Sequence, residues 1–157
     1  MSDLSVRPAS IEDLEIIVAN NIAMARETEG KALDPDTVRR GTRAALKDPA
    51  LGFYFLAERG GRVVGQLMIT FEWSDWRDAV FWWIQSVYVA PEARRGGVYR
   101  ALYQRVLEEA RRAGNVCGIR LYVERHNAGA QATYRSMGMS PTVYEMYEVD
   151  FPIEPGR

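Results

Sequence analysis

The sequence predicts an α/β (mixed α+β) fold: a central mixed sheet of about six or seven strands, with helices on both faces. Two apolar stretches flank Gly60–Gly61, and a two-residue glycine turn between such stretches is typical of a β-hairpin. A helical stretch separates apolar strands at 80–89 and 118–123, and a crossover of this kind makes the joined strands parallel. We therefore expect both kinds of strand pairing in one sheet.

The N-terminal third should contain one strand and two helices. The alternation of LSVRPA (4–9) predicts a short strand. Ser10 can cap the helix that follows, whose first turn carries acidic residues that suit the helix dipole. A second helix should begin at Asp34–Pro35 and run to about Lys47, since proline is tolerated at the first helical position.

The rest of the chain should alternate strands with helices. A polar, tryptophan-containing loop at 73–79 precedes the central strand, and a helix from Val98 should end at Gly114, a residue typical of helix C-termini. Asn127 can cap a further helix that ends at Gly138. The expected strands are 4–9, 52–59, 62–70, 80–89, 118–123 and 142–149.

Length and composition favour one domain, residues 1–157, with a frayed tail at 152–157. Hydrophobic residues make up 47% and charged residues 26%, which is ordinary for a soluble globular protein. The N-terminus has no signal-peptide pattern and the chain has no 18-residue apolar run. A cytoplasmic protein that enters no membrane is expected.

Cys117 is the only cysteine and His126 the only histidine. An intramolecular disulfide is excluded, and too few nitrogen and sulfur ligands remain for a dedicated zinc site, so no metal is expected. A Ser-His-Asp or Cys-His nucleophile would have to use His126, and no G-x-S-x-G elbow precedes it.

The charge is unevenly distributed. The net charge of −1 gives no overall attraction to nucleic acid or to an anionic membrane. Residues 93–113 nevertheless carry six arginines against two glutamates, a local charge of +4 that leaves −5 on the rest of the chain. This basic segment indicates an anionic ligand at one place.

The loop APEARRGG (90–97) lies between the central strand and a helix N-terminus. The first N–H groups of a helix have no partner inside it, and glycines let phosphate oxygens approach. From the loop alone, a surface turn with solvated arginines is equally expected. A nucleotide P-loop would end in Gly-Lys-Ser/Thr, where Val98–Tyr99–Arg100 stands, and the glycines do not fit the dinucleotide fingerprint.

The same stretch resembles the acyl-CoA loop of the GNAT (GCN5-related) N-acetyltransferase superfamily, Q/R-x-x-G-x-G/A after V-x-P-E. Arg94 and Gly97 match this form, whereas Tyr99 departs from it at the last position. The predicted element order also resembles the family from about Leu4 to Phe151. A second family motif, N-x-x-A-x-x-x-Y-x-x-x-G-F/M, is matched by Asn127, Ala130, Tyr134, Gly138 and Met139.

The resemblance implies direct transfer of an acetyl group from acetyl-CoA to a primary amine of a small molecule, a protein or a peptide. It implies that the loop backbone binds the CoA pyrophosphate, that pantetheine runs beside strand 84–89, and that an N–H near Val87 polarises the thioester carbonyl. Family members are often homodimers, which is the protein partner implied. The residues implied in acetyl-CoA binding are Val87, Tyr88, Val89, Arg94, Arg95, Gly96, Gly97, Val98, Tyr99, Asn127, Ala130 and Tyr134.

Tyr134 is the expected general acid for the departing thiolate. An amine of pKa about 10.4 must lose a proton before it attacks, so a base or a water relay is also expected. Glu72 is the first candidate base and Glu124 the second, and a backbone carbonyl with water is an alternative. An acyl-CoA-binding sensor or assembly module without turnover is the alternative function.

The acceptor amine is expected near the first two helices, the 73–79 loop and the last strands. Acidic side chains would attract a cationic amine, and tryptophans would give it an aromatic wall. The candidates are Glu27, Glu29, Asp75, Asp78, Trp73, Trp76 and Trp83.

Overall fold

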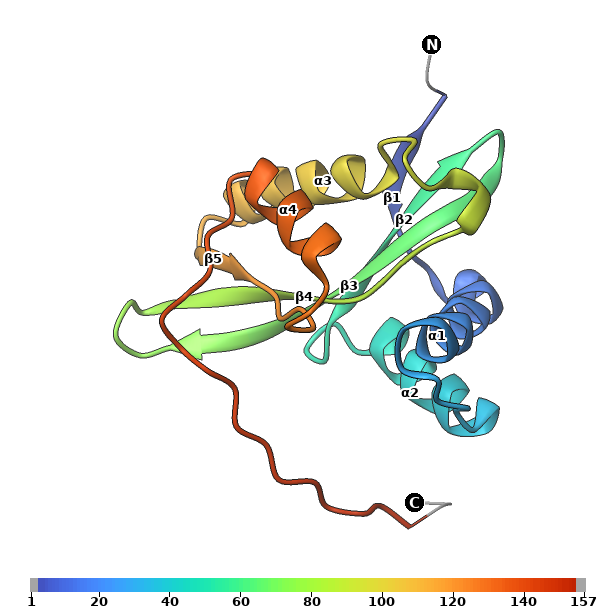
Figure 1. Cartoon of the computed structure of the whole chain (residues 1–157), viewed down its shortest axis with the longest axis horizontal. Coiled ribbons are helices and arrows are strands. Elements are labelled where there is room, and N and C mark those ends of the chain that lie inside the picture. The colour runs from blue at the N-terminus through green and yellow to red at the C-terminus, as the bar shows by residue number, and fades with distance from the viewer. Residues whose placement is uncertain (1–2, 155–157) are drawn as a thin grey trace. The chain divides into compact units, whose positions relative to one another are not determined.

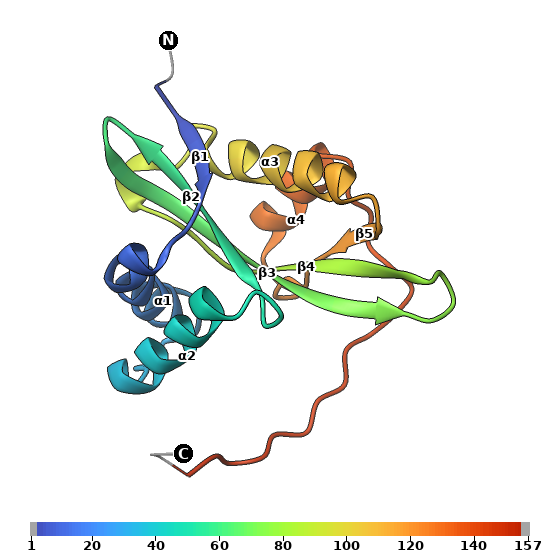
Figure 2. The same ribbon diagram turned by 180° about the vertical axis from the view of Figure 1, so that it is seen from behind.

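The computed structural model describes residues 3–154, and the chain divides into two compact units, one that ends at Leu121 and one that begins at Tyr122. Figure 1 shows the elements in chain order, and Figure 2 shows them from behind. The first unit holds β1 (Ser5–Pro8), a 3-10 turn (Ile11–Asp13), α1 (Leu14–Glu29), α2 (Pro35–Lys47), β2 (Phe53–Arg59), β3 (Arg62–Ser74), β4 (Ala79–Val89), a second 3-10 turn (Pro91–Ala93), α3 (Val98–Ala113) and β5 (Val116–Arg120), and the second unit holds α4 (Ala128–Ser136).

The first unit is built on a five-stranded sheet in the order β1-β2-β3-β4-β5. Strands β1 to β4 pair antiparallel and β4 pairs with β5 in parallel, so the predicted mixed sheet is confirmed. The predicted hairpin is β2–β3, with Gly60 at φ +57° and Gly61 at φ +73° in the turn. Two left-handed residues give the turn a twist that matches its strands.

The sixth predicted strand, 142–149, is wrong: these residues follow an extended course but belong to no strand of the described chain. Their alternation creates two faces, but a strand also needs a neighbour for its N–H and C=O groups. The fifth strand lies at 116–120 rather than 118–123. The predicted loop 73–79 shortens to a turn at 75–78, because β3 and β4 extend further than expected.

Helices cover both faces of this sheet, as predicted. Tyr54 and Leu56 of β2 share one buried cluster with residues of α1 and α2. Phe55 between them points to the opposite face, because successive side chains of a strand alternate, and Arg105 of α3 lies over its ring. Both views accordingly show α1 and α2 on one face and α3 on the other.

The predicted start of α2 is confirmed, whereas α1 begins one 3-10 turn later than predicted, with Asp13 rather than Ser10 at its N-cap. The Ser10 N–H donates to the Asp13 carboxylate at 2.8 Å, and one 3-10 turn precedes α1. The Asp34 carboxylate accepts a hydrogen bond from the Thr37 N–H at 2.9 Å at the start of α2. Helix α1 ends where Gly30 takes a left-handed conformation with φ +63°.

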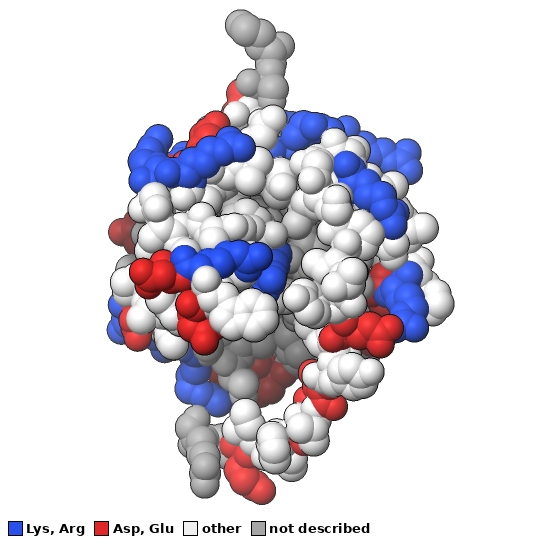
Figure 3. Space-filling view, turned by 90° about the vertical axis from the view of Figure 1, so that its left-hand side faces the viewer, with Lys and Arg blue, Asp and Glu red and all other residues white. Residues whose placement is uncertain are grey.

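The surface carries charges of both signs. The face in Figure 3 displays Lys and Arg together with Asp and Glu, so it presents no continuous field of one sign. Among residues 3–154, no helix combines the length and the apolar content needed to cross a membrane. The predicted frayed tail lies partly outside the described residues, and its described part, 152–154, is exposed and belongs to no helix or strand.

Candidate functional site

A β-bulge interrupts the central strand of the first unit. Strand β4 places two residues, Ser86 and Val87, opposite the single Leu67 of β3. Ser86 has a φ of +50°, a left-handed conformation that is strained for a residue other than glycine. A bulge bends its strand and leaves one residue outside the ladder, so it re-aims the backbone groups around Val87.

The same half of β4 has an open edge. Strand β5 pairs with β4 along residues 80–83 only. On that side, residues 84–89 face no strand within the described part of the chain. An open edge offers backbone N–H and C=O groups to an extended ligand. The predicted pantetheine-binding residues Val87, Tyr88 and Val89 belong to this half of the strand.

A buried amide fixes the bulge. The Gln66 side chain is 0% exposed, and its Nε2 donates to the Ser86 carbonyl at 3.2 Å and to Asn21 Oδ1 at 2.9 Å. Its Oε1 accepts a hydrogen bond from Asn20 Nδ2 at 3.0 Å. Such an amide tolerates little displacement, because each lost bond leaves a buried polar group unsatisfied. Gln66 therefore ties α1 to the strained residue of the bulge.

The hydrogen bonds continue from Gln66 to β2 and α2. The buried Tyr54 hydroxyl has the side chains of Thr42 and Asn21 as its partners. Burial raises the pKa of Tyr54, and these two hydrogen bonds partly offset the rise. We call Asn20, Asn21, Thr42, Tyr54 and Gln66 the polar network. It joins both helices of one face to the centre of the sheet.

The loop after β4 enters α3 through two left-handed residues, Arg95 with φ +63° and Gly97 with φ +77°. The Gly96 N–H, a predicted pyrophosphate donor, instead donates to the Ala93 carbonyl at 3.3 Å. No hydrogen bond among the described residues uses the N–H of Arg95 or of Gly97. Such N–H groups just ahead of a helix N-terminus suit an anion.

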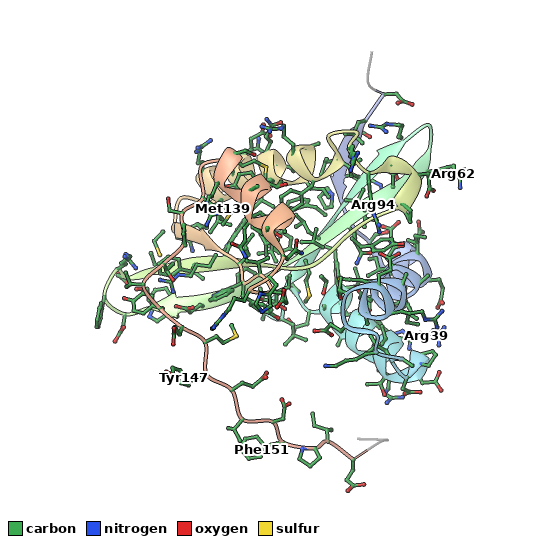
Figure 4. All side chains as sticks on the ribbon, in the orientation of Figure 1. Arg39, Arg62, Arg94, Met139, Tyr147 and Phe151 are labelled. Atoms are coloured by element: carbon green, nitrogen blue, oxygen red, sulfur yellow. The ribbon has the colours of Figure 1, made fainter. Side chains whose placement is uncertain are left out.

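Arg94, a predicted phosphate ligand, is engaged within the protein. Its Nε donates to the Val89 carbonyl at 2.9 Å, and its Nη2 donates to Glu27 of α1 at 2.6 Å. Figure 4 labels this side chain beside the loop and α1. Arg59 of β2 donates to the Gly96 carbonyl at 3.0 Å. Arg94 and Arg59 therefore clamp the loop.

Only part of the local positive charge is available to a ligand. Arg105 donates to the Val6 carbonyl at 2.9 Å and to Glu109 at 2.9 Å, so it joins α3 to β1. Arg95 and Arg100 are exposed, and no ion pair among the described residues includes either of them. These two arginines are the cations that the loop and the first turn of α3 present outward.

The first turn of α3 lies close against the sheet. A Cβ added at Gly65 of β3 would lie 2.5 Å from Val98 Cγ1, so only glycine permits this approach. The Tyr99 ring stacks with the ring of Tyr103 one turn later, with centroids 6.3 Å apart. The Tyr99 side chain thus lies along α3, while its N–H belongs to the first turn of the helix.

The predicted base, Glu72, is held by two side chains. Its Oε1 accepts a hydrogen bond from Trp83 Nε1 at 2.9 Å, and its Oε2 accepts one from Arg120 Nη1 at 2.7 Å. The Arg120 guanidinium also lies 3.6 Å from the centroid of the Phe81 ring. Each carboxylate oxygen accepts one of these hydrogen bonds and keeps a second lone pair, so Glu72 is held in place and can still accept a proton.

In the second unit, helix α4 carries the residues of the second predicted motif. The Asn127 side chain accepts a hydrogen bond from the Ala130 N–H at 3.1 Å and caps the helix, as predicted. Tyr134 is half-buried on α4, and burial raises the pKa of its hydroxyl. Glu124, the second candidate base, accepts a hydrogen bond from the His126 N–H at 2.7 Å.

The structure does not bring together the residues predicted to surround the acceptor. Residues 75–78 form the turn between β3 and β4, and Trp76 in this turn is 90% exposed. Asp78 is eight residues from Ser86 along β4, about 26 Å at the usual rise of a strand. Figures 1 and 2 show the turn at the opposite end of the sheet from α1, where Glu27 pairs with Arg94.

The acetyltransferase (GNAT) family model matches residues 19–139, which is more than half of the chain. This protein belongs to the GNAT acetyltransferase family. A possible acetyltransferase from Clostridium difficile 630 is 42% identical, with 96% of this chain and 99% of that chain covered and a TM-score of 0.89. The uncovered 4% of this chain is about six residues, so that match continues past Met139.

Two more distant GNAT-like structures share the fold. A GCN5-related N-acetyltransferase from Ralstonia eutropha JMP134 is 24% identical, covers 93% of this chain and 98% of its own, and has a TM-score of 0.74. A predicted acetyltransferase with acetyl-CoA from Clostridium acetobutylicum is 19% identical, with 94% and 96% covered and a TM-score of 0.75. No curated protein matches the sequence.

This GNAT protein is therefore an acyl-CoA-dependent N-acetyltransferase, and acetyl-CoA is the acyl donor of the family. The open edge at 84–89 and the loop N–H groups suit the pantetheine and the phosphates of such a donor. Within residues 3–154, no group of three or more His, Cys, Asp or Glu side chains is arranged to hold a metal ion.

Sequence reasoning missed the residues that organise the bulge of this GNAT protein: Gln66, Asn21 and Ser86. Gln66 interrupts the apolar run VVGQLMIT, and a polar residue inside a buried strand indicates a hydrogen-bond partner. Asn21 likewise interrupts the apolar face of α1. Nothing in the sequence around Ser86 indicates its positive φ.

Proposed function

We propose that this GNAT protein transfers the acetyl group of acetyl-CoA directly to a primary amine of a small molecule, a protein or a peptide. The observation that carries the proposal is the bulge at Ser86–Val87 together with the open edge at 84–89. An extended pantetheine arm would bond to the backbone of Val87 and Val89. The Val87 N–H would then donate to the thioester carbonyl as that oxygen gains negative charge.

The proposal assigns the CoA pyrophosphate to the loop and the first turn of α3. The N–H groups of Arg95 and Gly97 and the following turn, Val98–Tyr99, would bind the phosphate oxygens, with charge from Arg95 and Arg100. Arg94 and Gly96 would contribute indirectly, because their hydrogen bonds hold the loop in shape.

Tyr134 is the proposed acid, and Asn127 and Ala130 are the proposed pantetheine contacts from α4. The motif spacing of the three residues supports these roles. A raised pKa keeps the Tyr134 hydroxyl protonated at neutral pH, which a proton donor to the leaving thiolate requires. Bound acetyl-CoA would supply an activated acyl group, so the protein has only to bind, orient and move protons.

Proton removal from the amine is assigned to Glu72 through a relay of water molecules. Deprotonating an amine of pKa about 10.4 at pH 7 costs about 4–5 kcal/mol. Glu72 lies opposite Phe81, six residues along β4 from Val87 and about 20 Å away at the usual rise of a strand, so water rather than direct contact would carry the proton to the carboxylate. Arg120 would hold this carboxylate in place.

The test is release of CoA thiol from acetyl-CoA against a panel of primary amines, with direct binding of acetyl-CoA measured in parallel. Turnover with at least one primary amine is expected, and Tyr134→Phe should lower kcat while leaving the Kd for acetyl-CoA within about threefold. Tyr147→Phe, at a residue 89% exposed, is the matched control. Binding of acetyl-CoA without turnover on any amine would favour the sensor or assembly module instead.

A further inference from the structure

Two consecutive asparagines, Asn20 and Asn21, lie near the middle of α1. Asparagine is a poor residue for a helix interior, because its side chain competes for backbone hydrogen bonds. A sequence that breaks a local rule at one place indicates a function there. Both side chains bond to the buried Gln66 of β3, so the function of this pair concerns the polar network, which lies within the first unit.

The partner of Gln66 on β4 fixes the direction of the hydrogen bonds around this amide. The Ser86 carbonyl can only accept, so the Gln66 atom 3.2 Å from it must be the donor Nε2. The other end of the amide is then the acceptor Oε1, which takes a hydrogen bond from Asn20 Nδ2 at 3.0 Å. Asn21 Oδ1, at 2.9 Å from Nε2, accepts a further hydrogen bond and holds the amide in this orientation.

These hydrogen bonds lead through the bulge to the proposed oxyanion donor. The Ser86 carbonyl and the Val87 N–H belong to one planar, conjugated peptide group and point in opposite directions. A hydrogen bond accepted by the carbonyl therefore polarises the N–H. We call Asn20, Gln66 and the 86–87 peptide the amide series, because each amide donates to the next.

The surroundings of the amide series favour polarisation along it. Gln66 is 0% exposed, so water does not compete for its hydrogen bonds. In such a medium, hydrogen bonds in series strengthen one another by about 10–30% per bond. Ser86, at the inner end, is held at a φ of +50°, and strained residues other than glycine cluster at sites where the strain serves the mechanism. Burial thus favours transmission, and the strain marks the end where it acts.

We propose that Asn20 is a positioning residue that acts through Gln66 to strengthen the Val87 N–H as an oxyanion donor. Asn20 bonds to Gln66 and not to the bulge itself, so its effect on the reaction is indirect. As the amine attacks, the thioester oxygen gains negative charge, which a more strongly polarised N–H stabilises better. The inference rests on the proposed function, because it takes the Val87 N–H as the donor to the thioester carbonyl.

The expected effect on the rate is modest. An oxyanion donor contributes about 100- to 1000-fold, and a change of about 10–30% in its strength corresponds to about 2- to 8-fold. Asn20→Leu should therefore lower the single-turnover rate of acetyl transfer about 2- to 8-fold. The Kd for acetyl-CoA should stay within about threefold, because the loop before α3 binds the phosphates.

The direct test is the infrared stretching band of acetyl-CoA that is isotope-labelled at the acetyl carbonyl carbon, recorded on the full-length protein without amine. In the wild type, the band of bound acetyl-CoA should lie below that of free acetyl-CoA, because the Val87 N–H polarises the carbonyl. Asn20→Leu should return the band part of the way. Asn20→Asp keeps the shape of the side chain, removes the donor and adds a negative charge at the outer end, so it should return the band at least as far. It also carries the test if Asn20→Leu does not fold.

Asp34→Ala is the matched control for loss of stability. It removes the cap of α2, where the Asp34 carboxylate accepts from the Thr37 N–H at 2.9 Å, so it should lower the melting temperature without moving the band. A band that stays in place in both Asn20 variants would overturn the inference and leave acetyl transfer intact. A band that moves equally in Asp34→Ala would also overturn it, since loss of stability would then explain the shift.

The wild type separates failure of the inference from failure of the proposed function. Thiol release by a wild type whose bound acetyl-CoA shows an unshifted band would overturn the amide series and the Val87 donor, while acetyl transfer would stand. A wild type that does not bind acetyl-CoA would overturn the proposed function and the inference with it.

Discussion

Replacing Gln66 by leucine keeps most of the side-chain volume and removes three hydrogen bonds. Asn21 Oδ1 and the Ser86 carbonyl each lose a donor, at about 1–3 kcal/mol for a buried group, whereas the half-buried Asn20 can turn to water. Asn21 keeps Tyr54 as a partner, so the lower end applies and the total loss of stability is about 2–3 kcal/mol. For a chain of this size, the melting temperature should fall by roughly 4–12 °C.

The kinetic effect of Gln66→Leu should exceed its effect on binding. Without the amide, Ser86 can leave its left-handed conformation, which releases strain of about 1–3 kcal/mol and re-aims the Val87 N–H. Removing an oxyanion donor lowers kcat about 100- to 1000-fold, so misalignment of one should lower it about 10- to 100-fold. The KM for acetyl-CoA should change less than about threefold, since the loop before α3 binds the phosphates.

The assay is steady-state thiol release at saturating amine, with melting temperature measured on the same preparations. Ser86→Gly supplies the matched control, because glycine takes a φ of +50° without strain and should retain kcat. In the Gln66→Leu background, Ser86→Gly should restore part of kcat without restoring the melting temperature to its original value. A Gln66→Leu protein that melts lower but keeps kcat and KM within twofold would falsify the claim that the polar network orients the bulge.

Gly97→Ala and Gly114→Ala both place alanine at a φ of +77° with open space around the added Cβ, so each should lower the free energy of unfolding by about 1 kcal/mol. Only Gly97→Ala should weaken the binding of acetyl-CoA, as measured by calorimetry. Equal binding by the two variants would remove the loop from the phosphate site. Because burial raises the pKa of Tyr134, kcat should not decline with rising pH below about pH 10. Tyr134→Phe should lower kcat about 10- to 100-fold. A decline of kcat that begins near pH 8 would argue against Tyr134 as the acid. Glu72→Gln should lower kcat/KM at pH 7, and the kcat/KM of the variant should recover as the pH approaches the pKa of the amine. A loss that does not depend on pH would mean that Glu72 only holds Arg120 and Trp83. The hydrogen bond from Arg7 lowers the pKa of Asp13, so this carboxylate stabilises the fold above about pH 3.9 and the contribution disappears as the pH falls further. Asp13→Asn should therefore melt lower than the wild type at pH 7, and the difference should shrink as the pH falls through the lowered pKa of Asp13. A difference that stays constant as the pH falls would contradict the assignment.

Local signals were sufficient for most of the fold. The hairpin at Gly60–Gly61, the start of α2 at Asp34 and the cap at Asn127 each depend on residues within a few positions of one another. Such features can be predicted because turn and cap chemistry is decided by neighbouring residues. The strand at 142–149 was predicted by the same kind of local pattern and is wrong, because a strand also requires a neighbour that the pattern cannot supply.

The sequence by itself determined the family resemblance, the element order up to α4, and the loop and helix residues that carry the two motifs. Only the tertiary structure decided what those residues can do. It engaged Arg94 with Glu27 and both oxygens of Glu72 with other side chains, and it placed Gln66 against the strained Ser86. These pairs are separated by 11 to 67 residues in the chain, so their contacts depend on how α1, β3, β4 and β5 pack. The properties of a residue alone fix its possible bonds, and packing selects which of them form.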